Sequence, residues 1–187
     1  APFAGLYSHE ETGNGITFRR DQAVARWCRE HNVSWQEFAQ FGVVRRLKSR
    51  NGWRAKWEAH VSAPCWQAPT PADLQFTPLP WDEPSPPTPD ALGLGPYDPP
   101  QRQRGGRTLG LSVLNDFLQQ RSAEYRGGIS SPLTAPSACS RLSPYLAYGC
   151  LSLREIVQAT RRQRARLPAE ASRQKKGLTA FISRLYW

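Results

Sequence analysis

The chain has 187 residues, enough for one large domain or two small ones. Its mean hydropathy of −0.60 suits a soluble protein, and the sequence has neither an apolar run long enough to cross a membrane nor a signal peptide. The four cysteines form no Cys-x-x-Cys pair, so we expect reduced thiols and a cytoplasmic location. The formal charge of +10 favours a polyanionic partner over a membrane, although a basic chain can simply be soluble.

Charge and proline usage divide the chain into three parts. Residues 1–62 carry a net charge of +4, residues 63–106 carry −3 and residues 107–187 carry +9. Twelve of the 17 prolines lie within residues 64–100, which predicts an extended connector. The chain lacks methionine and stops inside an apolar helical pattern. We expect a fragment of a longer protein; the alternative is a complete small protein with a processed N-terminus.

The apolar spacing predicts a mainly helical fold with a small α/β part. Residues 35–38 read as a short extended stretch, and residues 41–44 as a strand or a turn. A capping box at Ser152-Leu153-Arg154-Glu155 predicts that a helix begins there. The helices expected along the chain cover residues 18–31, 53–61, 108–125, 140–148, 152–166 and 172–187.

The segment from Ser137 to Ser152 has the most distinctive composition. Serine hydroxyls suit helix N-caps, Pro144 suits a first helical turn, and Gly149 suits a helix end. The free N–H groups of a first turn attract phosphates, and Arg141 would add a charge-assisted contact. These residues are compatible with a phosphate cradle and equally with an ordinary capped helix.

The run Cys139-Ser140-Arg141-Leu142-Ser143-Pro144-Tyr145-Leu146, followed by Tyr148-Gly149-Cys150-Leu151-Ser152, resembles the flavin-binding signature of the DNA photolyase and cryptochrome family. The resemblance implies that residues 1–62 are the C-terminal part of a Rossmann-like α/β antenna domain. It makes residues 63–106 the interdomain linker. Residues 107–187 would then begin the helical FAD-binding domain.

The resemblance also implies FAD as the cofactor, with its phosphates held by Tyr125, Ser140, Arg141 and Ser143. Cys139, which stands where the family usually has threonine, and Leu142 belong to the same segment. The expected cofactor-binding set is completed by Phe181. An antenna chromophore of folate or deazaflavin type would lie near Glu10 or Glu11.

For DNA, the resemblance places Trp187 beside a flipped lesion, where an aromatic side chain can stack on a base. Two positions depart from the family pattern: Arg184 replaces a glutamate, and Ile129 stands where an arginine contacts DNA. Arg126 is the candidate substitute for that arginine. The implied partner is UV-damaged DNA, bound by a monomer. No catalytic side chain and no metal site are predicted within the chain.

Three functions remain open from the sequence. The first is a light-driven photolyase that splits pyrimidine dimers, and the second is a cryptochrome-like photoreceptor without repair activity. The third is a basic nucleic-acid-binding module without catalysis. A dense basic cluster would contact phosphates in the third case, or would be a solvated helix surface. The cluster comprises Arg161, Arg162, Arg164, Arg166, Arg173, Lys175 and Lys176.

Overall fold

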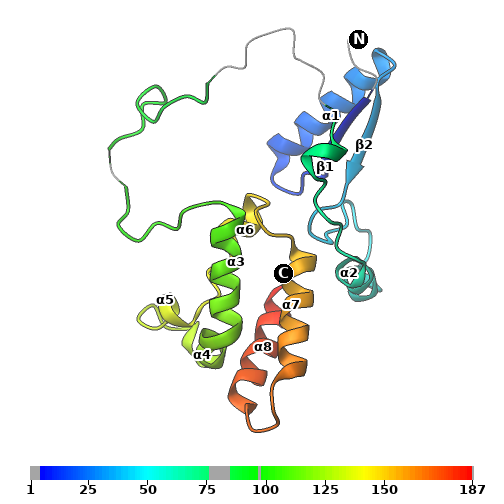
Figure 1. Ribbon diagram of the computed structural model, residues 1–187. Coiled ribbons are helices and arrows are strands. Elements are labelled where there is room, and N and C mark those ends of the chain that lie inside the picture. The colour runs from blue at the N-terminus through cyan, green and yellow to red at the C-terminus, as the bar shows by residue number, and fades with distance from the viewer. Residues whose placement is uncertain (1–4, 76–84, 97, 187) are drawn as a thin grey trace. The chain divides into compact units, whose positions relative to one another are not determined.

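The computed structural model describes residues 5–75, 85–96 and 98–186, and its regular structure is mostly helical (Figure 1). The described residues up to 63 and from 105 onward group into one packed unit. Residues 64–104 form a second unit, whose one short 3₁₀ helix, η1 (Pro71–Asp73), is closed by a capping box between Thr70 and Asp73. Among the described helices, none is both long enough and apolar enough to span a bilayer.

The N-terminal residues form a β–α–β element. Strand β1 (Gly5–His9) pairs in parallel with β2 (Ser34–Phe38), in a register that sets Gly5 opposite Ser34 and His9 opposite Phe38. Helix α1 (Gly15–Glu30) connects them, and the Asn14 side chain caps it by accepting the N–H groups of Ile16 and Thr17. The predicted extended stretch 35–38 is therefore part of β2, and the predicted helix 18–31 begins three residues earlier than expected. Of residues 41–44, predicted as a strand or a turn, residues 41 and 42 form a bend and residues 43 and 44 have no regular structure, so the strand alternative is wrong.

Helix α2 (Trp53–Ser62) packs against α7 (Leu153–Arg166), which lies almost a hundred residues further along the chain. Trp57 is 1% exposed at the centre of this contact. Its ring stacks on Tyr186 with the ring centroids 3.9 Å apart. The buried residues of this small core are Trp57, Val61, Leu153 and Val157.

The end of α2 is held by polar side chains of α7. Arg154 Nε donates to the carbonyl oxygen of His60 at 2.8 Å, and Gln158 Nε2 donates to those of Val61 and Ala63 at 3.0 and 2.8 Å. The last carbonyls of a helix have no partner within it, so these bonds replace water at the end of α2. The two parts of the chain are thus joined by polar contacts as well as by apolar packing.

The main core lies among the C-terminal helices. Three consecutive segments follow one another without a loop: α3 (Arg107–Asp116), the π-helical turn η2 (Phe117–Arg121) and α4 (Ser122–Gly128). The sequence predicted one helix over 108–125, and the structure inserts the wider π turn into it. Two short helices follow, α5 (Ala135–Ala138) and α6 (Ser143–Ala147), and then α7 and α8 (Ser172–Arg184).

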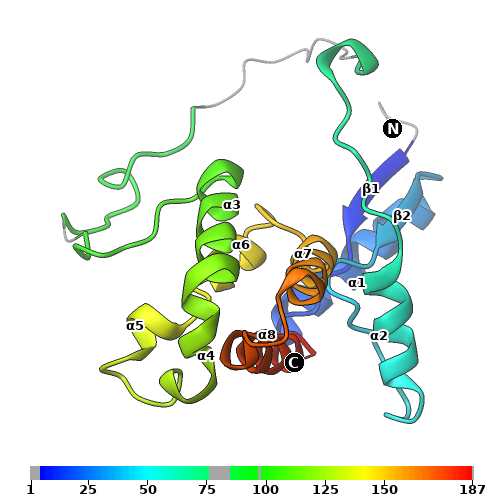
Figure 2. The same cartoon turned by 60° about the horizontal axis from the view of Figure 1, so that its bottom comes forward.

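Helices α4 and α8 lie side by side (Figure 2). They approach each other closely at Gly177. A Cβ atom at this glycine would overlap the carbonyl oxygen of Ser122. One turn earlier, Gln174 Nε2 donates to the carbonyl of Leu118 at 2.8 Å and to the Ser122 hydroxyl at 3.2 Å. The absence of a side chain at Gly177 therefore sets the distance between these two helices.

Candidate functional site

The segment of residues 139–152, called here the signature segment, differs in detail from the predicted helix over 140–148. Residues 140–142 are not helical, and α6 begins at Ser143. Its N-cap is Leu142, which makes no side-chain cap bond, so the expected serine cap is wrong. Pro144 does lie in the first turn, and Gly149 follows the helix with a φ of +66°. The shorter helix leaves Ser140 and Arg141 in a loop ahead of it.

Arg121 of the π turn holds this loop in place. Its guanidinium donates to the carbonyl oxygens of Cys139 and Ser140, and to that of Val113 on α3 at 3.2 Å. An ion pair with Asp116 fixes the same guanidinium from the other side. These bonds fix the backbone of the loop at Cys139 and Ser140.

The backbone of Arg141 turns the chain between the core and the surface. Its φ of +57° lies in the left-handed region, which costs a non-glycine residue about 1 kcal/mol or more. The next side chain, Leu142, is 1% exposed in the main core, whereas Ser143 is exposed. The strained turn therefore leaves Leu142 buried, Arg141 half-buried and Ser143 exposed.

Tyr125 and Phe181 lie together in the main core. Each ring meets the other edge-to-face, with centroids 5.5 Å apart, and both pack in the same way on Phe117. Burial raises the pKa of the Tyr125 phenol above its usual value, the nearby Cys139 thiol raises it further, and Arg184 opposes the rise. The phenol thus stays protonated, as a hydrogen-bond donor, next to the signature segment.

The predicted cofactor-binding residues therefore differ in what they present to a ligand. Leu142 and Phe181 are almost completely buried and act as packing beneath the segment. Cys139, Ser140 and Arg141 are half-buried, and Ser143 is exposed. Two hydroxyls and one guanidinium within four residues make a donor-rich set, whose chemistry fits the diphosphate of a flavin dinucleotide.

The end of the signature segment is tied to α3. The Ser152 hydroxyl accepts the N–H of Glu155 at 3.1 Å, which confirms Ser152 as the N-cap of α7. The Glu155 carboxylate binds Arg107 through two hydrogen bonds of 2.6 and 3.0 Å. The Glu155 carboxylate is thus bound by the first residue of α3. The sequence predicted the start of α7 but not this ion pair.

Two of the three residues predicted to contact DNA, Arg126 and Arg184, are exposed. Arg184 is exposed at the end of α8, and Trp187 lies outside the described residues. Arg126 is exposed and lines a shallow hollow of about 400 Å³ formed by α4, α7, α8 and the loop before α8. We call it the basic hollow; its polar lining includes Arg126, Arg164, Ser172, Lys175, Lys176 and Thr179.

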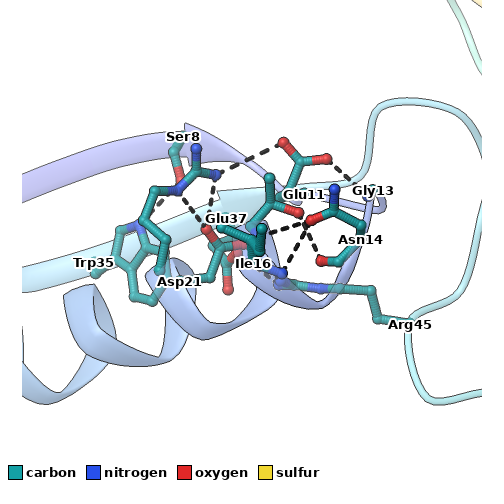
Figure 3. A network of polar contacts seen from close by, with 11 residues as sticks. Ser8, Glu11, Gly13, Asn14, Ile16, Asp21, Trp35, Glu37 and Arg45 are labelled. Carbon is teal, nitrogen blue, oxygen red and sulfur yellow. Dashed lines mark hydrogen bonds and ion pairs between the residues drawn. The ribbon is translucent and has the colours of Figure 1, made fainter.

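The two candidate antenna glutamates have different surroundings. Figure 3 shows Glu11 in a network of polar contacts that also contains Arg45, Asp21 and Glu37. Arg45 makes ion pairs with Glu37 at 2.6 Å, Asp21 at 3.1 Å and Glu10 at 3.7 Å. Glu11 makes an ion pair with Arg20 at 3.7 Å, accepts the N–H of Gly13 at 2.8 Å and lines a hollow of about 380 Å³. Of the two, Glu11 is the one that lines this hollow.

Comparisons with known proteins agree with the resemblance seen in the signature segment. The chain is 28% identical over 135 residues to a deoxyribodipyrimidine photo-lyase of Halobacterium salinarum, a match that covers 72% of this chain and 27% of that protein. No family model matches the chain. The chain therefore spans about a quarter of the length of this relative.

Solved structures give the same answer for the fold. The chain superposes on a cryptochrome of Synechocystis with a TM-score of 0.70 and 21% identity, and on a bacterial class III photolyase of Agrobacterium tumefaciens with a TM-score of 0.64 and 19% identity. Each superposition covers 98% of this chain and 40% of the other. The fold is thus that of part of a photolyase or cryptochrome. Together, sequence and fold support the predicted membership of the photolyase and cryptochrome family.

Sequence reasoning missed the residue that organises this site. The sequence predicts Arg121 only as part of the helix over residues 108–125, because the spacing of residues along that helix does not indicate which carbonyl groups the Arg121 side chain contacts. A basic residue in the middle of an apolar helical pattern is the one available signal. The contact depends on the π turn, which local sequence does not reveal.

Proposed function

We propose that this chain forms one wall of an FAD site in a light-driven flavoprotein, and that its reaction is the splitting of pyrimidine dimers in UV-damaged DNA. The observation that carries the proposal is the signature segment. Its order of residues resembles the flavin-binding signature, and Arg121 fixes the backbone of its loop at the carbonyls of Cys139 and Ser140. In this proposal residues 1–62 belong to the antenna domain and residues 63–106 to the linker, while residues 107–187 begin the FAD-binding domain.

The bound flavin would supply the light-driven electron transfer, and the residues of the chain would bind and orient it. Ser140 and Ser143 would donate hydroxyl hydrogen bonds to the flavin phosphates, and Arg141 would neutralise their charge. Tyr125 would donate from a phenol that burial keeps protonated. Leu142 and Phe181 would support these groups from the core, which keeps the wall rigid.

Flavin retention by the whole protein tests the first part of the proposal. The double variant Ser140→Ala, Ser143→Ala removes two donors to a charged group, each worth about 1.5 kcal/mol or more, so the affinity for FAD should fall roughly a hundredfold. Ser137→Ala is the matched control, because its hydroxyl bonds the Thr134 carbonyl within the preceding turn. Equal retention of FAD by the double variant and the control would contradict the proposed site.

Light-dependent loss of cyclobutane dimers from an oligonucleotide tests the reaction itself. Repair by the flavin-loaded whole protein is the expected result. Flavin binding without repair would favour the second candidate, a cryptochrome-like photoreceptor. The exposed Arg184 supports that alternative, since it carries a positive charge where the family has a glutamate. In that case Arg184→Glu should increase binding to dimer-containing DNA relative to undamaged DNA.

An antenna chromophore remains part of the proposal at the N-terminal end. Glu11 and the backbone of Gly13 border the same hollow, together with Phe18 and Arg46. The guanidinium of Arg46 lies 5.2 Å from the centre of the Phe18 ring. An aromatic face, a cation and a carboxylate suit a planar heterocycle, as in a folate or a deazaflavin. Glu11→Gln should therefore reduce chromophore content in the whole protein while leaving FAD content unchanged.

A further inference from the structure

The structure distinguishes two groups of basic residues in the C-terminal part. The first group consists of arginines that already hold a carboxylate. Arg161 pairs with Glu58 at 2.7 Å, and Arg173 pairs with Glu124. These side chains fasten helices to one another, so their charges are largely neutralised within the protein.

The second group lines the basic hollow. Arg126 comes from α4, Arg164 from α7, and Lys175 and Lys176 from α8. Within the described part of the chain, the residues that line the hollow include no carboxylate. Over residues 5–75, 85–96 and 98–186, the structure gives none of these four cations an ion pair. Like charges brought together from three helices repel one another, and an anion in the hollow would relieve that repulsion.

The rest of the lining indicates which kind of anion fits. Ser172, Thr179 and Ser183 contribute hydroxyl groups, and Ala169 and Ala180 are small. Among the residues that the structure describes, no aromatic side chain lines the hollow, so these residues offer no platform on which a base could stack. Lysine and arginine side chains beside hydroxyls are the groups that contact phosphate oxygens in nucleic-acid complexes.

We propose that the basic hollow binds neighbouring phosphates of a nucleic-acid backbone, without reading the bases. This inference rests on the proposed function only in that nucleic acid is taken as the source of the phosphates. The binding itself requires neither flavin nor light. The hollow would anchor a strand by charge, so its contribution should be independent of sequence and of damage.

The test measures binding of a fluorescein-labelled oligothymidylate to the chain in the dark over a range of salt concentrations. The hollow variant is Arg164→Gln, Lys175→Gln, Lys176→Gln. Its matched control is Lys48→Gln, Arg50→Gln, Lys56→Gln, which removes the same charge from exposed positions remote in sequence from the hollow. Loss of three contacts to single-stranded phosphates should reduce the slope of log K against log salt by about 2 and weaken binding roughly a hundredfold near 0.1 M salt. The control should change binding much less.

A second pair of variants guards against misfolding of the triple variant. Ala169→Glu places a carboxylate in the exposed lining of the hollow, and Ala55→Glu places one on the exposed face of helix α2. We expect Ala169→Glu to weaken binding clearly more than Ala55→Glu does. Equal effects within either pair would show that only net charge matters and would overturn the proposal.

Competition distinguishes phosphate from other polyanions. Inorganic polyphosphate should displace the oligothymidylate from the wild-type chain, and the hollow variant should lose affinity for both. Displacement by polyglutamate at the same concentration of charge would instead assign the hollow to an acidic protein partner and refute the nucleic-acid proposal. FAD content, measured separately in the whole protein, reports on the proposed function and should be unchanged in every variant.

Discussion

Replacing Gly177 with alanine adds one methyl group where α8 touches the backbone of α4. A Cβ atom there would overlap the Ser122 carbonyl oxygen, and Tyr125 Cβ would lie 3.6 Å away. An ordinary contact of a Cβ atom begins at 3.4 Å, so the two helices must separate by well over an ångström. Neither neighbour can move aside alone, because the obstructing atom belongs to the backbone of a helix.

The magnitude follows from three contributions. Overpacking a well-packed contact costs about 1–3 kcal/mol. Separating the helices also uncovers part of Tyr125 and Phe181, and exposing about 80 Å² of these rings would cost about 2 kcal/mol. Alanine favours a helix over glycine by about 1 kcal/mol, which opposes the other two contributions. The net expectation is a loss of about 3 kcal/mol, or a fall in Tm of roughly 6–12 °C.

Thermal and urea unfolding of the chain, followed by circular dichroism, measure this loss. Gly15→Ala is the control, because it lies in the first turn of α1 and its nearest contact is the flexible end of Arg19 at 3.4 Å. We expect that control to be neutral or slightly stabilising. If Gly177→Ala also raises the Tm, the close approach of α4 and α8 is wrong, and with it the argument that this glycine positions Tyr125.

Three further predictions concern the site and its supports. Arg121→Gln should lower the free energy of unfolding by about 2 kcal/mol and weaken FAD binding in the whole protein, whereas Arg162→Gln, at an exposed position, should do neither. Burial and the nearby Arg154 lower the pKa of His60, so the unfolded chain binds a proton more readily. Stability should therefore fall as the pH drops below about 6.5, and urea titrations of His60→Gln should show a smaller fall. The isolated 187-residue chain should not retain stoichiometric FAD through purification, and a flavin absorbance of one equivalent would contradict this.

Local sequence predicted much of the helical structure correctly. Helices α2, α7 and α8 begin within a residue or so of their predicted starts, because each start is marked by an apolar period or a cap. The Ser152 hydroxyl, for example, makes the predicted cap bond with Glu155. The prediction failed where the structure depends on contacts between residues that are distant in the sequence. Strand β1 is only five residues long, and it forms by pairing with β2 across an intervening helix.

The same distinction applies to the candidate site. The order of residues in the signature segment determined, without coordinates, which family the chain resembles and which side chains are suited to a phosphate. The structure then shortened the predicted helix, buried Leu142 and exposed Ser143. Because Arg141 adopts a left-handed backbone conformation, sequence spacing alone could not give these orientations.

The sequence by itself determined the periodic helices, the basic charge of the C-terminal part and the chemical character of the signature segment, because these properties reside in neighbouring residues. Only the tertiary structure decided which charges are neutralised and which converge. Arg161 lies beside Glu58, whereas Arg164, one turn further along the same helix, lines the basic hollow with Lys175 and Lys176. The physical reason is that a helix turns successive side chains to different faces, so packing against α2 and α8 assigns each cation its partner.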